Sequence, residues 1–153
     1  MIKLYEKLFS FLGLLRHPLL LILRVYWGWS FFQIGFEKLK DIQKPIAFFA
    51  GLGIPHPTLS AYLVGGTETI GGLLLIAGFL SRLACIPLIT LLMVALFTAH
   101  LEATNNILQD PKVFLQQAPI FFLNACLWVM IAGPGCFSVD AVLKKLKRNP
   151  VSP

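Results

Sequence analysis

The chain has 153 residues, of which 57% are hydrophobic and 13% are charged, and its net charge at pH 7 is +6. Soluble domains are typically about 45–50% apolar and about 25% charged, so this composition excludes an ordinary soluble domain and indicates an integral membrane protein. The basic residues are spread along the chain without an aromatic–basic stripe, which favours Lys- and Arg-rich cytoplasmic loops over nucleic-acid binding.

The N-terminal stretch MIKLYEKLFSFLGLLRHP predicts an amphipathic helix that lies in the cytoplasmic interface of the membrane. No small-residue cleavage site follows its charged residues, so it does not resemble a cleaved signal peptide. Pro18 suits the first turn of a helix and is expected to open the first membrane span. The apolar residues at helical spacing are Leu4, Leu8, Phe11, Leu12 and Leu15.

Four segments have the roughly 20 mostly apolar residues that a transmembrane helix needs. They cover about residues 18–37, 59–79, 83–101 and 115–132. Their continuous apolar runs favour helices over a β-barrel, and the short turn near Ser81 makes the second and third spans antiparallel neighbours. We therefore expect an all-α membrane protein. We expect residues 1–153 to form a single domain, a four-helix transmembrane bundle with an amphipathic interfacial helix at each end.

The distribution of basic residues predicts that both termini face the cytoplasm, because cytoplasmic loops carry the excess of Lys and Arg. The heavier side holds Lys3, Lys7, Arg16, Arg82, Lys144, Lys145, Lys147 and Arg148. The lighter side holds Lys38, Lys40, Lys44 and Lys112.

The stretch SVDAVLKKLKR, residues 138–148, predicts a short basic helix on the inner membrane surface. Ser138 suits the N-cap, and Asp140 falls in the first turn, where a carboxylate favours the helix dipole. We also expect Asp140 to pair with Arg82. Such a pair would hold the GPG segment against the turn between the second and third spans.

Arg24 stands inside the first span, where an unpaired charge costs about 2.5–3.5 kcal/mol on insertion scales. On a helical wheel Gly28 and Gly35 fall within about 40° of Arg24, which is typical of a helix-packing face. In the second span, Glu68 shares its face with the small residues Ala61, Gly65 and Gly72. We therefore expect Arg24 and Glu68 to form an ion pair between the two spans.

Such a pair is either a register lock for the bundle or part of a cavity that binds a polar ligand or moves a proton. Arg24 can alternatively snorkel to inner-leaflet phosphates. Further candidates for ligand contact are Trp27, Gln33, His100 and Asn124, although packing or interhelical hydrogen bonding explains each of them as well. The three cysteines form no CxxC motif and are expected to be packing residues, and the histidines show no metal-ligand spacing.

The chain resembles the DoxX family of small four-helix membrane proteins over nearly its whole length. In the first span the resemblance rests on Arg24 followed by FFQIGFEKL, and in the second on GGTETIGGLLLIAGFLSRLA. The later stretch GPGCFSVD is similar to the family's closing GPG-x-x-S-x-D pattern. The matching residues are Gly35, Lys38, Glu68, Gly71, Gly72, Gly78, Arg82, His100, Gly133, Pro134, Gly135, Ser138 and Asp140.

The resemblance implies a multi-pass protein of the bacterial inner membrane. Its relatives include a subunit of a thiosulfate:quinone oxidoreductase and components of membrane redox complexes for oxidative stress. It therefore implies a quinone-interacting or accessory subunit that works with a membrane or periplasmic protein partner. Quinone is the cofactor that fits this hypothesis, since the sequence carries no flavin, haem or iron–sulfur motif of its own.

Two other functions stay open. The chain can be a carrier or channel for a small solute, with Glu68 as a proton-coupled gate; four spans without inverted repeats would then need a homo-oligomer. It can also be a non-catalytic membrane scaffold for a partner protein, with its glycine-lined faces serving only for packing. Whether the chain is an enzyme in its own right is left open by the sequence.

Overall fold

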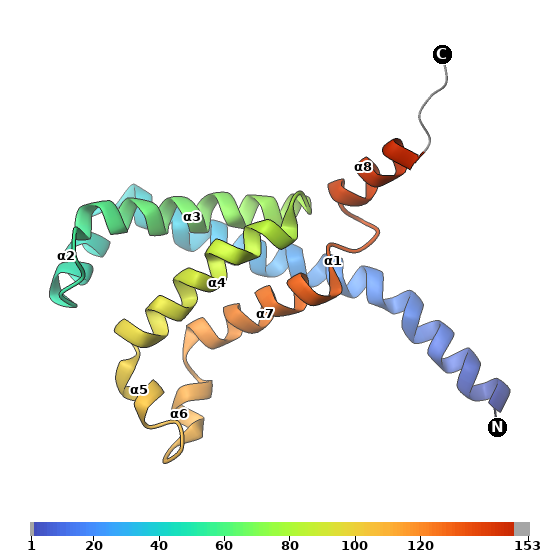
Figure 1. Ribbon diagram of the computed structural model, residues 1–153, viewed down its shortest axis with the longest axis horizontal. Helices are drawn as coiled ribbons and strands as arrows, with labels where there is room; N and C mark the ends of the chain where they lie inside the picture. The colour runs from blue at the N-terminus through green and yellow to red at the C-terminus, as the bar shows by residue number, and fades with distance from the viewer. Residues whose placement is uncertain (1, 149–153) are drawn as a thin grey trace.

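The computed structural model describes residues 2–148, and the side chains of residues 17–146 within them. This part of the chain contains eight helices and no strand, which confirms the expected all-α class (Figure 1). The helices are α1 (Ile2–Lys40), α2 (Gln43–Gly51), α3 (Pro57–Ala77), α4 (Ser81–Thr98), α5 (Leu101–Asn105), α6 (Pro111–Leu115), α7 (Ala118–Ala132) and α8 (Val139–Arg148).

Helix α1 is continuous through Pro18, so the expected boundary between an N-terminal helix and the first span does not exist as a break. A proline inside a helix removes one backbone hydrogen bond without forcing the chain to stop. Figure 1 shows the first part of α1 projecting away from the other helices. The amphipathic face predicted for residues 1–16 lies outside the described side chains.

Among the described residues, three helices are long and apolar enough to cross a membrane: α1 from His17, α3 and α4. The fourth, α7, is a shorter apolar helix of 15 residues. It starts later than expected because the backbone is extended at Gln117 and Pro119 then occupies the first turn. The arrangement is a membrane helical bundle, as the sequence predicts.

Helices α1 and α3 are the most closely packed pair in the bundle, and glycine makes their approach possible. A Cβ atom at Gly72 would lie 2.6 Å from both the carbonyl oxygen of Gly28 and the backbone nitrogen of Phe32. A Cβ atom at Gly35 would lie 2.5 Å from the backbone nitrogen of Thr69. Small residues of this kind let helix backbones touch where lipid supplies no hydrophobic driving force.

The core is built from four helices. Its buried members are Phe31 on α1, Leu75 on α3, Cys85, Leu88 and Leu92 on α4, and Cys126 and Val129 on α7. Figure 1 shows α3 and α4 meeting at the end that carries α8 and diverging toward the end that carries α2 and α5. We call these the α8 end and the α2 end. Many large apolar side chains, such as Ile22, Leu83 and Ile131, are exposed, as lipid-facing residues would be.

Candidate functional site

Arg24 is fully buried, with only 1% of its surface exposed, and its charge is answered by backbone carbonyls. Its Nε atom donates to Leu75 O at 2.9 Å, and Nη2 donates to Ile76 O at 3.3 Å. Nη1 donates to Pro134 O, and Nη2 donates to Phe137 O at 3.2 Å. The guanidinium group therefore ties α1 to the end of α3 and to the loop between α7 and α8.

These partners suit a cation for a physical reason. Leu75 and Ile76 belong to the last turn of α3, where carbonyl groups lack the usual amide partner four residues on. Leu75 O accepts instead from the capping amide of Gly78 at 3.2 Å, and Arg24 is its second donor. The same carbonyl end carries the negative pole of the helix dipole. Gly78 closes α3 in the left-handed conformation, with φ +68°, and a Cβ there would lie 2.5 Å from Nη2 of Arg24. The turn is thus shaped around the guanidinium group.

The expected ion pair between Arg24 and Glu68 is not formed, and that prediction was wrong. Glu68 lies seven residues before Leu75 on α3, which is about 10 Å along the axis at 1.5 Å per residue. The helix faces were read correctly, but the axial register of the two helices puts Arg24 level with the end of α3 rather than with its middle. The snorkelling alternative also fails, because the Arg24 head group faces inward.

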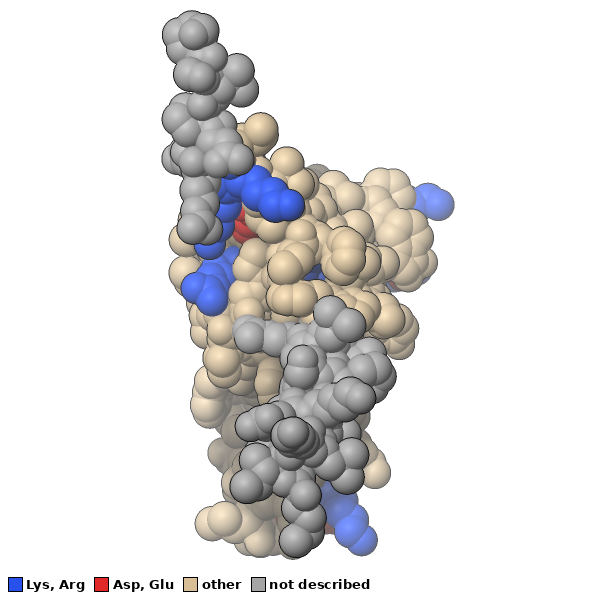
Figure 2. All heavy atoms as spheres, turned by 90° about the vertical axis from the view of Figure 1, so that its right-hand side faces the viewer, with Lys and Arg blue, Asp and Glu red and all other residues tan. Residues whose placement is uncertain are grey.

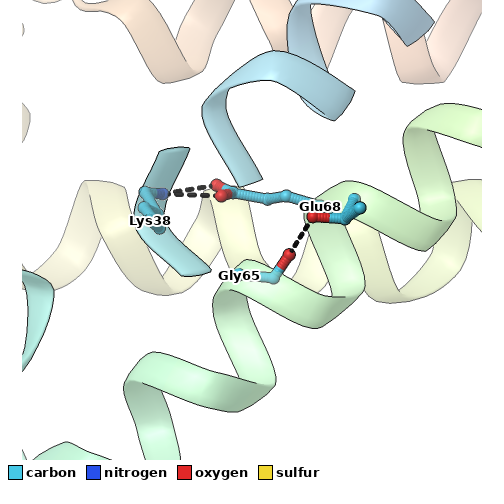
Figure 3. A network of polar contacts seen from close by, with 4 residues as sticks. Lys38, Gly65 and Glu68 are labelled. Carbon is cyan, nitrogen blue, oxygen red and sulfur yellow. Dashed lines mark hydrogen bonds and ion pairs between the residues drawn. The ribbon is translucent and has the colours of Figure 1, made fainter. Parts of the chain in front are cut away.

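Glu68 pairs instead with Lys38, near the end of α1. The Nζ atom of Lys38 lies 2.7 Å from both Oε1 and Oε2 of Glu68. Figure 3 shows the Lys38 ammonium group facing the Glu68 carboxylate. The Glu68 side chain is 12% exposed and that of Lys38 is 30% exposed. This pair is therefore shielded on the side of Glu68 and open on the side of Lys38.

Sequence reasoning noted Lys38 but did not propose it as a site residue, although a signal was present. Lys38 follows Arg24 by 14 residues, which brings it within about 40° of Arg24 on a helical wheel. It also lies three residues from Gly35, whose position against the Glu68 Cβ keeps α1 and α3 in contact here. Beside the pair, the Thr69 hydroxyl donates to Gly65 O at 2.7 Å within α3.

The remaining predicted candidates are dispersed. Trp27 packs edge-on against Phe122 of α7, with ring centroids 4.9 Å apart. Asn124 is exposed and its amide donates to Ile120 O of its own helix. Gln33 is exposed, and His100 is partly exposed at the start of α5. Within residues 17–146, the hydrogen bonds of Arg24 and Glu68 involve none of these candidates.

The predicted Arg82–Asp140 ion pair is replaced by contacts to the backbone. The Asp140 carboxylate accepts from the amides of Leu80 at 3.0 Å and Ser81 at 3.4 Å, while Arg82 Nη2 donates to Ile131 O at 3.4 Å. The first amides of α4 lack partners within the helix, so they attract the carboxylate more directly than an exposed side chain does. The turn after α3 and the start of α8 are still held together.

Ser138 caps α8, as predicted. Its Oγ atom accepts from the amide of Ala141 at 3.1 Å and donates to the carbonyl oxygen of Gly135 at 2.8 Å. Asp140 follows in the first turn of the helix. The loop before α8 is therefore fixed from both sides, by Ser138 and by Arg24.

The sequence is similar to those of known membrane proteins. The sequence profile of the DoxX family matches residues 19–101, which include α1 from Leu19 onward, α3 and α4. The chain belongs to the DoxX family. The matched segment of this DoxX protein contains Arg24, the Lys38–Glu68 pair and Gly78.

Relatives from bacteria cover most of the DoxX chain. "Putative oxidoreductase CatD" of Bacillus subtilis is 34% identical over 129 residues, which are 84% of this chain and 90% of the relative. "Inner membrane protein YphA" of Escherichia coli is 29% identical over 129 residues, covering 84% of this chain and 92% of the relative. No solved structure matches this one.

Proposed function

We propose that this DoxX protein is an accessory subunit of a redox system in the bacterial inner membrane and that it binds quinone at the Lys38–Glu68 pair. The observation that carries the proposal is the pair itself, an ion pair of a transmembrane segment that is partly open on its lysine side. Intramembrane ionisable groups are expensive to bury and are functional candidates by default. One relative is named as a putative oxidoreductase and another as an inner membrane protein, and these names support a redox role in the inner membrane.

The chemistry of the pair suits a quinone ring. A quinone carbonyl accepts a hydrogen bond, which the Lys38 ammonium group can donate, and a quinol hydroxyl donates one, which the Glu68 carboxylate can accept. Reduction of the ring takes up protons, and a carboxylate beside an ammonium group is a suitable relay. Arg24 has no part in this site, because its donors are occupied by carbonyl groups at the α8 end.

An aromatic surface lies on the same face of α1 as Lys38. Trp27 and Phe31 precede Lys38 by 11 and 7 residues, which puts both within about 20° of it on a helical wheel. Both rings contact Phe122 of α7, with centroid distances of 4.9 Å for Trp27 and 4.6 Å for Phe31. Along the helix axis, however, Phe31 and Trp27 lie about 10 Å and 16 Å from Lys38 at 1.5 Å per residue, and Phe31 is buried in the core. These rings therefore belong to the packing between α1 and α7 and do not contact a ring bound beside Lys38.

The proposal also includes a partner and an orientation. The sequence carries no motif for a flavin, haem or iron–sulfur cluster, so a membrane or periplasmic partner would supply the electron transfer that precedes or follows quinone binding. The excess of Lys and Arg at the α8 end supports an orientation with both termini in the cytoplasm. Glu68 then lies near the middle of α3, and Lys38, close to the end of α1, reaches it from the periplasmic side.

The test is mass spectrometry of the organic extract from protein purified in mild detergent. We expect stoichiometric quinone in the parent protein and its loss in the Lys38→Met and Glu68→Gln variants. The matched control is Asp41→Asn, which breaks a second ion pair, at 2.8 Å to Lys44, whose side chains are 51% and 84% exposed. The control should retain quinone.

Two results would contradict the proposal. Quinone absent from the parent protein would leave no ligand for the site and would favour a carrier or a scaffold. Quinone retained at full occupancy in Lys38→Met and Glu68→Gln would place the ligand elsewhere. A monodisperse elution profile for each variant is required, so that loss of quinone is not loss of the fold.

A further inference from the structure

A groove of about 830 Å³ lies at the α8 end, between α8, the start of α4 and the loop after α7. It is separate from the Lys38–Glu68 pair, which lies toward the other end of the bundle. The groove combines two kinds of lining: the cations Arg82 and Lys144, and the leucines Leu83, Leu143 and Leu146. Figure 2 shows Lys and Arg side chains gathered on this end of the molecule, beside an acidic one.

The charges of the groove favour an anion. Arg82 and Lys144 are both exposed and line the groove. The carboxylate in the lining is Asp140, and it already accepts from the amides of Leu80 and Ser81. Those amides form the positive end of α4, so the negative charge of Asp140 is compensated locally. Nη2 of Arg82 donates to Ile131 O at 3.4 Å, but a neutral carbonyl does not cancel its charge, so Arg82 and Lys144 together attract a further anion.

The apolar residues that line the groove favour a lipid over a free anion. Leu83 is 59% exposed and belongs to the outward face of α4, which continues along the span through Ile86. Leu143 and Leu146 lie on α8 and are exposed as well. A free phosphate would contact only the cations and would make no use of these leucines. A phospholipid would cover them with its acyl chains while its phosphate reaches the cations.

We infer that this groove binds an anionic phospholipid, with the headgroup phosphate between Arg82 and Lys144 and the acyl chains along Leu83 and Leu143. The guanidinium fork of Arg82 matches the oxygens of a phosphate, and Lys144 adds a second positive charge. The lipid would hold α8 against the end of the bundle at the membrane surface. The site is thus distinct from the proposed quinone site in both ligand and location.

The experiment is native mass spectrometry of the full chain in detergent, with phosphatidylglycerol and phosphatidylcholine of identical acyl chains added at equal concentration. We expect preferential retention of phosphatidylglycerol by the parent protein. Arg82→Gln and Lys144→Gln should each lower its binding roughly fivefold, the effect of one Lys or Arg near an anionic surface. Lys112→Gln, which removes an exposed cation of α6, is the control and should bind like the parent.

Three outcomes would overturn the inference. Equal binding of the two lipids would show that the groove does not select a negative headgroup. A loss in Lys112→Gln equal to that in Lys144→Gln would show a general charge effect. Displacement of phosphatidylglycerol by an equal concentration of glycerol phosphate would show a free-anion site. Because Lys144 is exposed on α8, its variant keeps the test valid even if Arg82→Gln fails to fold.

Discussion

The Nε atom of Arg24 lies 2.9 Å from the carbonyl oxygen of Leu75, across the contact between α1 and α3. Arg24, early in the membrane span of α1, thereby donates hydrogen bonds to carbonyl groups in the last turn of α3. Because the same guanidinium group reaches Pro134 and Phe137, it also fixes the loop that leads to α8. Arg24 thus holds α1, α3 and the loop before α8 together, and the quinone site that we propose lies at Lys38 and Glu68 instead.

Replacing Arg24 by methionine should strongly destabilise the protein. The substitution leaves buried carbonyl groups without donors, and each unsatisfied buried group costs about 1–3 kcal/mol. We expect a loss of about 3 kcal/mol or more, measured as a fall in the thermal midpoint of the detergent-purified protein. An unchanged midpoint would show that the carbonyl contacts contribute little.

Gly78→Ala should be more destabilising than Gly53→Ala. Both glycines have positive φ, +68° and +70°, so both substitutions carry the conformational cost of about 1 kcal/mol. At Gly53 nothing lies within 4 Å of the new Cβ, whereas at Gly78 the Cβ would meet Arg24 and Ser138. The difference between the two thermal midpoints isolates the steric term. Equal thermal midpoints of the two variants would show that the turn at Gly78 accommodates the added Cβ atom with no further loss of stability.

The close approach of α1 and α3 can be tested with a pair of helical glycines. Gly35→Ala would place a Cβ 2.5 Å from the backbone of Thr69 and should force the helices apart, at a cost of about 1–3 kcal/mol. Gly66→Ala adds a methyl group to open space and should be neutral, or stabilising by up to about 1 kcal/mol. Comparable thermal stability of the two variants would argue against a tight α1–α3 contact.

The Lys38–Glu68 pair should behave differently when one or both partners are removed. Glu68→Gln alone leaves Lys38 without its counter-charge, and we expect a loss of about 1–3 kcal/mol, reduced because Lys38 is partly exposed. The double variant Lys38→Met with Glu68→Leu should recover most of that stability while still losing bound quinone. A double variant that keeps its quinone would separate this pair from the ligand.

Asp140 and Arg82 should show no energetic coupling, although they lie at the same end of the bundle. Asp140→Ala removes the acceptor for the first amides of α4 and should cost about 1–2 kcal/mol, as loss of an N-cap does. A double-mutant cycle with Arg82→Gln on thermal stability should give an interaction energy near zero. A coupling above about 0.5 kcal/mol would restore the ion pair that the sequence suggested.

Much of this architecture is predictable because it depends on periodicity within one helix. The apolar runs fix α3 and α4, and the helical wheel puts Gly28, Gly35 and Arg24 on a common face. What a wheel cannot supply is the axial register between two helices. The partner of Glu68 depends on that register, and Arg24 would be level with Glu68 only if α1 were shifted by about seven residues, or about 10 Å, along α3.

Other features depend on groups that the sequence does not display. Carbonyl oxygens are present at every residue, so nothing marks Leu75 or Phe137 as acceptors for Arg24. Pro18 is an ordinary signal for a helix start, but the helix passes through it because neighbouring backbone bonds suffice. The extended backbone at Gln117 follows from local turn geometry and shortens α7 against the apolar run.

The bonds from Arg24 to Pro134 and Phe137 join positions 110 and 113 residues apart. During synthesis the arginine therefore enters the membrane long before half of its acceptors exist. Until the loop after α7 has been made, Arg24 has only the end of α3 to satisfy it. A chain that stops before Pro134 therefore carries a buried arginine with only part of its hydrogen bonds. Synthesis of residues 134–137 completes the set of acceptors for Arg24.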